Sequence, residues 1–196
     1  MSITFHEDGR MVHIRNKKIS YIMKILDGKY LTHCYFGRRL REYHDNRREY
    51  FFKKAYTTTD DLTIENVSMD DIGMELPVRG RGDFRIPALS VVAGNGIEYV
   101  DLHFKEWKVL EQKQKIQGMP STFGKNGEVE TLEIICEDKI AKIRVYLYYS
   151  IFDEKSIITR HQRIENYGEE DIILENVKSM SLDLPAQEYD WISFDL

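Results

Sequence analysis

The side chains that could act as acids and bases in this sequence are carboxylates, and many of them stand in short acidic runs. Such runs occur at 60–61, 70–71 and 169–171, next to residues that are typical of turns. Acid–base chemistry by two carboxylates requires that both face one scissile bond, and no spacing in the sequence pairs two of them. Solvated turns are the plainer interpretation of these acidic runs.

Motifs that bind metals or phosphate are absent from the sequence. No CxxC or HExxH pattern occurs, and the glycine-rich stretch at 79–83 lacks the lysine and the spacing of a phosphate-binding loop. We therefore expect no metal and no cofactor. The six histidines stand at no ligand spacing and are expected to be bonded locally; they are His6, His13, His33, His44, His103 and His161.

One aromatic residue has an unusual position for core packing. Read as a strand, the last six residues place Ile192, Phe194 and Leu196 on one face. Trp191 falls on the opposite, more polar face, where its flat apolar surface and its N–H group suit the C–H face of a sugar ring. Burial of Trp191 by a neighbouring element is the alternative, and the pattern leaves both open.

Composition narrows the class of protein. The chain has 196 residues, of which 42% are hydrophobic and 12% aromatic, which is enough for one sizeable core with a bias toward strands. A net charge of -5 gives no overall attraction to nucleic acid, and no apolar run approaches the roughly 18 residues that a membrane span requires. The N-terminus does not resemble a secretory signal, so Cys34 and Cys136 are predicted to be reduced thiols in a cytoplasmic protein.

Period-two alternation, interrupted by turn residues, dominates the chain. Asp8-Gly9 and Asp27-Gly28 are predicted to close hairpins, and the turn at 94–96 is predicted to join strands at 89–93 and 97–104. The alternation is cleanest from residue 130 onward, where strands are predicted at 131–136, 141–149, 157–165 and 172–184. Strands at this spacing predict an all-β fold, a large antiparallel β-sandwich.

The stretch at 38–54 departs from this pattern. It contains seven basic and three acidic residues, few aliphatic residues and no clear period. We predict a long solvated loop there, with a subunit contact or a loop that faces a binding site as the alternatives. The chain also ends while apolar residues still alternate, so we expect residues 1–196 to be one domain of a longer protein.

Short stretches along the whole chain, in the same order, resemble a known family. The family is the N-terminal domain of the large bacterial α-galactosidases, the retaining glycoside hydrolases of family 36. The matching stretches are ISYIMK (19–24), His33 with YFG (35–37), GDFR (82–85) with PA (87–88), GMPST (118–122), ETLEI (130–134), YSIF (149–152), ITR (158–160), NYGEE (166–170), SMSLDLP (179–185) and YDWI (189–192).

This resemblance implies a supersandwich similar to galactose mutarotase, which packs on a (β/α)8 barrel and contributes to a tetramer. In that family the barrel carries both catalytic aspartates, so a chain limited to this domain is expected to be inactive. The whole enzyme would hydrolyse terminal α-linked galactose in sugars such as melibiose and raffinose. This domain would shape the rim of the substrate pocket and support oligomerisation.

Two substrate-binding positions follow from the resemblance. Trp191 matches the tryptophan that lines the galactose pocket of the family. Lys53 stands two residues before the Ala55-Tyr56 pair, where the family often has an aspartate that bonds a sugar hydroxyl. A lysine can donate to a hydroxyl but cannot accept from one, so the acidic contact is missing or replaced here.

Two other functions are weighed against this one. A free-standing sugar-binding module would use Trp191 without a barrel, although one platform cannot enclose a sugar ring. A mutarotase-like enzyme would need a paired histidine and glutamate on the face of the sandwich. No spacing in the sequence supports such a pair, and this hypothesis ranks last.

Overall fold

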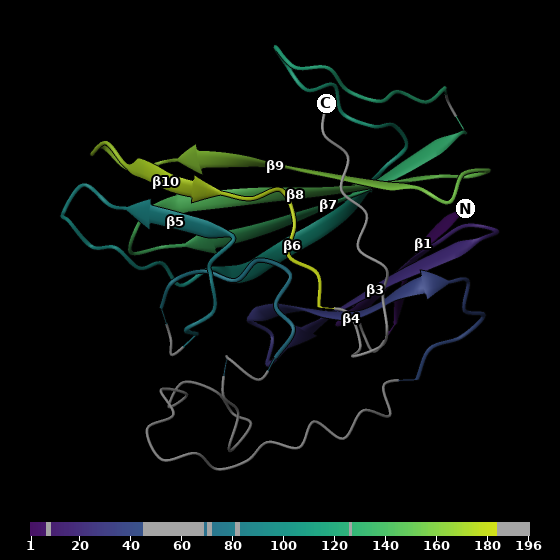
Figure 1. Cartoon of the computed structure of the whole chain (residues 1–196), viewed down its shortest axis with the longest axis horizontal. Coiled ribbons are helices and arrows are strands. Elements are labelled where there is room, and N and C mark those ends of the chain that lie inside the picture. Colours follow the sequence, from purple (N-terminus) through teal and green to yellow (C-terminus); the bar gives the residue numbers. More distant parts are fainter. Residues whose placement is uncertain (7–8, 45–68, 70–71, 81–82, 126, 184–196) are drawn as a thin grey trace.

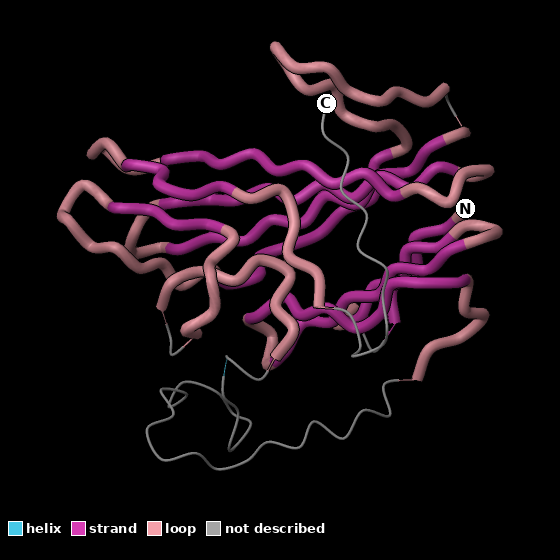
Figure 2. Tube along the Cα trace, viewed as in Figure 1, coloured by secondary structure: helices cyan, strands magenta, loops and turns pink. Residues whose placement is uncertain are grey.

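The computed structural model describes residues 1–6, 9–44, 69, 72–80, 83–125 and 127–183. These residues form antiparallel strands without an α-helix, which confirms the predicted all-β class (Figures 1 and 2). Among the described residues the strands are β1 (Ser2–His6), β2 (Met11–Arg15), β3 (Ile19–Leu26), β4 (Tyr30–Arg38), β5 (Leu89–Val92), β6 (His103–Leu110), β7 (Val129–Asp138), β8 (Ile143–Phe152), β9 (Ile158–Asn166) and β10 (Ile173–Val177).

The first sheet is a meander of β1, β2, β3 and β4 in chain order. Both predicted hairpins of this sheet are confirmed, because β1 pairs with β2 and β3 pairs with β4. Asp27 and Gly28 have φ angles of 50° and 70°. This left-handed conformation costs glycine little and is tolerated by aspartate, which explains why these residues connect β3 to β4.

The second sheet is a meander of β6, β7, β8 and β9, and it follows the predicted pattern closely. Ile143, Val145 and Leu147 of β8 are fully buried in the core, as their alternation indicates. The intervening side chains of Arg144 and Tyr146 lie on the outer face, where both contact Glu165 of β9. Each wholly buried Leu or Ile contributes roughly 1.5–3 kcal/mol to folding.

The two four-stranded sheets stack as the layers of a sandwich, with β5 and β10 beside the second sheet (Figure 1). The space between them is filled by one large cluster of apolar side chains from both sheets and from β5. Among its members are Ile14, Met23, Leu89, Leu132 and Leu147, each at most 1% exposed. The predicted antiparallel β-sandwich is therefore confirmed.

One predicted hairpin is wrong. The turn at 94–96 forms, with the Gly96 N–H donating to the Ala93 carbonyl at 2.8 Å, but residues 97–102 are not a strand. The strand β5 pairs with β10 instead, and β6 begins only at His103 and pairs with β7. The hydrogen-bonding edge of β5 is thus occupied by a strand much further along the chain. This strand, β10, ends at Val177, whereas the sequence predicted a strand over 172–184.

A short segment carries a charged residue into the sandwich. Residues 72–75 run beside β4, where His33 N–H donates to the Gly73 carbonyl at 2.7 Å and Glu75 N–H donates to the Leu31 carbonyl at 3.1 Å. Met74 pairs with Thr32 in the same interaction. This backbone pairing places the Glu75 side chain between the two sheets.

Candidate functional site

Glu75 is the centre of a polar cluster in the interior of the sandwich. Its side chain is wholly buried, and Tyr21 donates a hydrogen bond to Oε1 at 2.8 Å. Tyr149 donates to Oε2 at 2.7 Å, and His33 Nδ1 lies 2.9 Å from Oε1 in position to donate. A buried carboxylate must be paired and hydrogen-bonded to be tolerated, and these three donors satisfy both oxygens.

Arg160 of β9 supplies the positive charge of this cluster. Its Nε donates to the Tyr149 hydroxyl at 3.1 Å, and its guanidinium lies 5.3 Å from the centre of the Tyr149 ring. Nη2 donates to the main-chain carbonyl of Glu75 at 3.1 Å, and Nη1 donates to the carbonyl of Ser179. Arg160 therefore offsets the Glu75 charge through a shared tyrosine and holds two separate backbone segments.

The electrostatics of the cluster favour fixed hydrogen bonds over proton transfer. Burial, and then the neighbouring Glu75 carboxylate, raise the pKa of Tyr21 well above its usual range. Burial also raises the pKa of Tyr149, against the opposing effect of Arg160. Both phenols consequently remain protonated donors at ordinary pH, and the cluster acts as a fixed link between the two sheets.

The pairing of His33 with Glu75 is a feature that the sequence did not indicate. These residues are 42 positions apart, so no local spacing could have revealed them. A mutarotase-like site needs such a pair on the face of the sandwich, whereas His33 is only 8% exposed and Glu75 is not exposed at all. Because both carboxylate oxygens already accept hydrogen bonds, this pair does not present a base to a sugar.

A cavity of about 230 Å³ adjoins the cluster. The rings of Tyr21, Phe36 and Tyr149 form part of its wall together with the side chain of Arg160. The segment after β10 closes another side through Met180 and neighbouring residues. The cavity is therefore mainly apolar, and its one charged wall residue, Arg160, is already engaged with its neighbours.

The two predicted substrate-binding residues, Lys53 and Trp191, lie outside the described residues. However, Gly73, which follows Lys53 in the chain, lies close to Asp183, which precedes Trp191. The Asp183 Oδ2 atom is 3.1 Å from the point where a β-carbon on Gly73 would stand, so a glycine leaves room for this approach. Arg85 lies beside the same carboxylate, with Nη1 3.5 Å from Asp183 Oδ2.

Other polar groups of the described residues serve local structure. Asp138 accepts hydrogen bonds from the N–H groups of Ile140 and Ala141 and so caps the turn between β7 and β8. Neither Cys34 nor Cys136, both of which the structure describes, forms a disulfide, and burial raises the pKa of the Cys136 thiol to about 12. Across the described ranges, no group of three or more His, Cys, Asp or Glu is placed to hold a metal ion.

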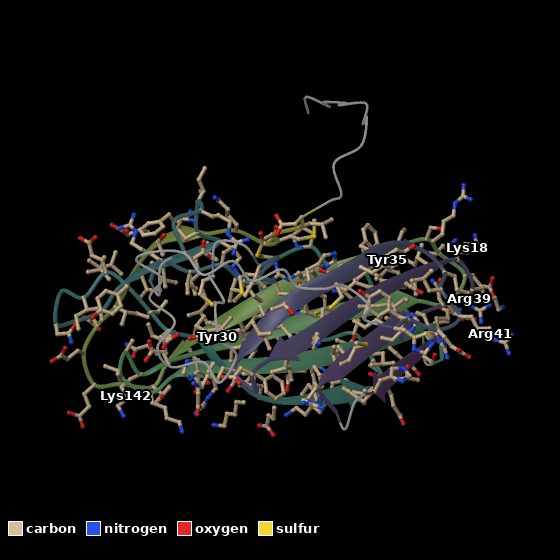
Figure 3. All side chains as sticks on the ribbon, turned by 90° about the horizontal axis from the view of Figure 1, so that it is seen from below. Lys18, Tyr30, Tyr35, Arg39, Arg41 and Lys142 are labelled. Atoms are coloured by element: carbon tan, nitrogen blue, oxygen red, sulfur yellow. The ribbon has the colours of Figure 1, made fainter. Side chains whose placement is uncertain are left out.

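Basic residues gather at one end of the molecule, where Lys18, Arg39 and Arg41 lie together, while Lys142 lies at the opposite end (Figure 3). The Arg39 N–H donates to the Lys18 carbonyl at 2.9 Å, and Arg15 donates to the Arg41 carbonyl at 2.5 Å. These contacts place the start of the predicted loop at 38–54 against the first sheet. The structure describes this loop as far as residue 44, and it has no regular structure after β4 ends.

His13 is the histidine whose charge matters most for stability. It is 1% exposed, and its Nε2 lies 2.8 Å from the Ser20 hydroxyl. Burial, followed by the nearby charges of Arg15 and His6, lowers the pKa of His13 to about 4. The neutral ring is therefore strongly preferred in the folded protein.

We expect the protein to lose stability as the pH falls from about 6.5 to about 4. In this window an unfolded chain binds a proton at His13 and the folded chain does not, so acid favours unfolding by at most about 3 kcal/mol. The His13→Gln variant should show a flatter pH dependence in urea unfolding. An NMR titration that placed the His13 midpoint near 6.5 would contradict this expectation.

Among the described residues, the structure contains no helix that could span a membrane.

A family model described as the glycosyl hydrolase family 36 N-terminal domain matches residues 29–195. The α-galactosidase AgaA of Geobacillus stearothermophilus is 34% identical over 98% of this chain and 26% of its own length. Mel36A, an α-galactosidase of Lactobacillus acidophilus, is 30% identical over 97% of this chain and 26% of its own length.

Solved structures give the same result. The crystal structure of the family 36 α-galactosidase AgaB from G. stearothermophilus superposes with a TM-score of 0.83 at 32% identity, covering 92% of this chain and 24% of AgaB. An AgaA variant in complex with raffinose has a TM-score of 0.83 at 34% identity, covering 89% of this chain and 24% of the variant. This chain spans about a quarter of the length of these relatives. The expected resemblance is confirmed, and the chain belongs to the glycosyl hydrolase family 36 N-terminal domain family.

Proposed function

We propose that residues 1–196 form one non-catalytic domain of a longer α-galactosidase and shape the rim of its substrate pocket. The observation that carries this proposal is the match to α-galactosidases over 98% of this chain but only 26% of the relative. Relatives in this fold family have been solved in complex with raffinose and stachyose, which are galactose-containing oligosaccharides. The whole enzyme would release terminal α-linked galactose from sugars of this kind with retention of configuration.

The chemistry of the reaction supports a non-catalytic role for this chain. A retaining glycosidase requires two carboxyl groups about 5–5.5 Å apart on either side of the glycosidic bond. The buried carboxylates of the described residues have structural partners. Glu75 takes three side-chain donors and Asp83 pairs with Arg85. Glu133 pairs with Lys108, and Asp138 caps a turn. The catalytic pair would therefore come from the rest of the enzyme.

Trp191 and Lys53 are the residues that we propose to contact the sugar. An indole ring can stack on the C–H face of galactose and donate one hydrogen bond. The Lys53 ammonium can donate to a sugar hydroxyl in place of the aspartate that is frequent in the family. We further propose that the full enzyme is a tetramer and that it resides in the cytoplasm, where both thiols would stay reduced.

The proposal is tested by comparing this chain alone with a joined enzyme, in which residues 1–196 replace the corresponding N-terminal part of AgaA. We expect no release of galactose from raffinose by the chain alone and clear activity in the joined enzyme. Calorimetry of the chain alone with galactose should detect weak binding or none. Robust hydrolysis by the chain alone, or an inactive joined enzyme, would argue against the proposed function, and tight galactose binding would favour the free-standing module.

A further inference from the structure

Arg85 joins two stretches of backbone that are distant in sequence. Its guanidinium forms a two-pronged pair with Asp83, through Nε to Oδ1 at 2.9 Å and Nη2 to Oδ2 at 2.8 Å. Nη2 also donates to the carbonyl of Met69 at 3.1 Å, and Nη1 lies 3.5 Å from the Asp183 carboxylate. The pair with Asp83 fixes the plane of the guanidinium. The other contacts of the guanidinium are with Met69 in one stretch and with Asp183 in the other.

Arg160 makes a second connection between the same two stretches. Its Nη2 donates to the carbonyl of Glu75, and its Nη1 donates to the carbonyl of Ser179. Gln162, on the same strand, donates to the carbonyl of Lys178 at 2.9 Å. We name the two stretches the Glu75 segment (residues 69 and 72–75) and the Asp183 segment (residues 178–183).

We propose that Arg85 and Arg160 are positioning residues that hold the Glu75 segment and the Asp183 segment in one fixed relation. This inference rests on the proposed function, because the Glu75 segment follows the part of the chain that contains Lys53 and the Asp183 segment leads to Trp191. A shift of about 1 Å in a group that contacts the substrate is enough to impair how an enzyme positions that substrate. The two arginines thus act on the sugar through other residues and do not touch it.

The side-chain chemistry explains why arginine is required at both positions. A guanidinium has five N–H donors in a rigid plane, so one side chain can serve acceptors on two or three segments at once. A lysine ammonium keeps the charge but lacks this planar fork. Gly73 adds a steric condition, since a β-carbon there would stand 3.1 Å from Asp183 Oδ2 and the carboxylate would have to shift.

The first experiment measures amide hydrogen exchange in the 196-residue chain and in its Arg85→Lys, Arg160→Lys and Asp183→Asn variants. We expect peptides from both segments to exchange about tenfold faster in the Arg85→Lys variant, because the hydrogen bond to the Met69 carbonyl and the ion pair with Asp183 are both lost. Asp183→Asn perturbs an exposed residue and keeps the test valid if Arg160→Lys does not fold. Faster exchange confined to the neighbourhood of Arg85 itself would overturn the proposal.

Matched controls distinguish this effect from general loss of arginine. Arg79→Lys and Arg163→Lys alter arginines that pair with Glu98 and Glu165 and contact neither segment through a side-chain hydrogen bond. We expect exchange in both segments to be unchanged in these variants. Equal acceleration in Arg163→Lys and Arg160→Lys would count against a specific positioning role.

The second experiment uses the joined enzyme with raffinose. We expect Arg85→Lys to raise KM about tenfold while kcat changes much less, since a pocket wall that binds ground state and transition state alike affects KM. An inactive parent enzyme would refute the proposed function, whereas an active parent with an unchanged KM in Arg85→Lys would refute only the positioning role. The melting temperature of each variant separates a binding effect from a loss of folded protein.

Discussion

Replacing Glu75 with glutamine is expected to destabilise this domain by about 3 kcal/mol, a large share of the stability of a typical domain. Three side-chain donors lose a charged acceptor in this variant, and each such bond is worth roughly 1.5–3 kcal/mol. Arg160 also loses the charge that it faces across Tyr149. Because Arg160 is only partly buried, water can screen its charge, and the expected loss lies at the lower end of the range for broken buried pairs.

Urea unfolding followed by circular dichroism measures this loss. Glu98→Gln is a matched control, because Glu98 is 61% exposed and forms an ion pair with the exposed Arg79 at 3.1 Å. We expect the control to change stability by no more than about 0.5 kcal/mol. If Glu75→Gln changed stability as little as Glu98→Gln, the view that this cluster links the two sheets would be wrong.

The second large effect that we expect is weaker binding of raffinose when Trp191 is replaced. In the joined enzyme, Trp191→Ala should raise KM for raffinose about 30-fold, which corresponds to about 2 kcal/mol for the loss of an aromatic anchor in a binding site. This expectation depends on the proposed role of Trp191 as one wall of the galactose pocket. Steady-state kinetics measure it directly, and Trp191→Phe should recover part of the affinity because a ring remains to stack on the sugar.

Trp107 provides the control for this variant within the same chain. It lies on β6, where it contacts Phe5 and Phe104 at ring distances of 5.0 Å. Trp107→Phe should leave KM unchanged and at most lower stability. A Trp191→Ala enzyme with the KM of its parent would remove Trp191 from the proposed site.

The parts of the fold that the sequence predicted are those in which neighbours in the chain are neighbours in space. The hairpin of β7 and β8 has alternation and turn residues in one continuous stretch, so its strands and buried faces could be read directly. The pairing of β5 with β10 could not, because strands pair through backbone groups that every residue carries and nothing in either stretch encodes its distant partner. A glycine-containing turn at 94–96 favoured a local hairpin that the structure does not extend.

The candidate site depends on contacts between residues that are distant in sequence, and the sequence did not predict these contacts. Glu75 stands in a stretch with little periodicity, and its partners Tyr21, His33 and Tyr149 read as ordinary strand residues. Their common feature is their position in three dimensions, which depends on the stacking of two sheets. The roles of Trp191 and Lys53 were inferred from strand alternation and from family resemblance, and they stay predictions.

The Glu75 cluster also affects how the domain can fold as it is synthesised. The carboxylate meets Tyr21 from 54 positions earlier and Tyr149 from 74 positions later, and the Arg160 contact spans 85 positions. Contacts of this span slow folding, because long loops must close before the contacts contribute. We therefore expect the apolar face of the first sheet to stay partly uncovered during synthesis until the strands of the second sheet follow, and an uncovered apolar face favours association with other chains.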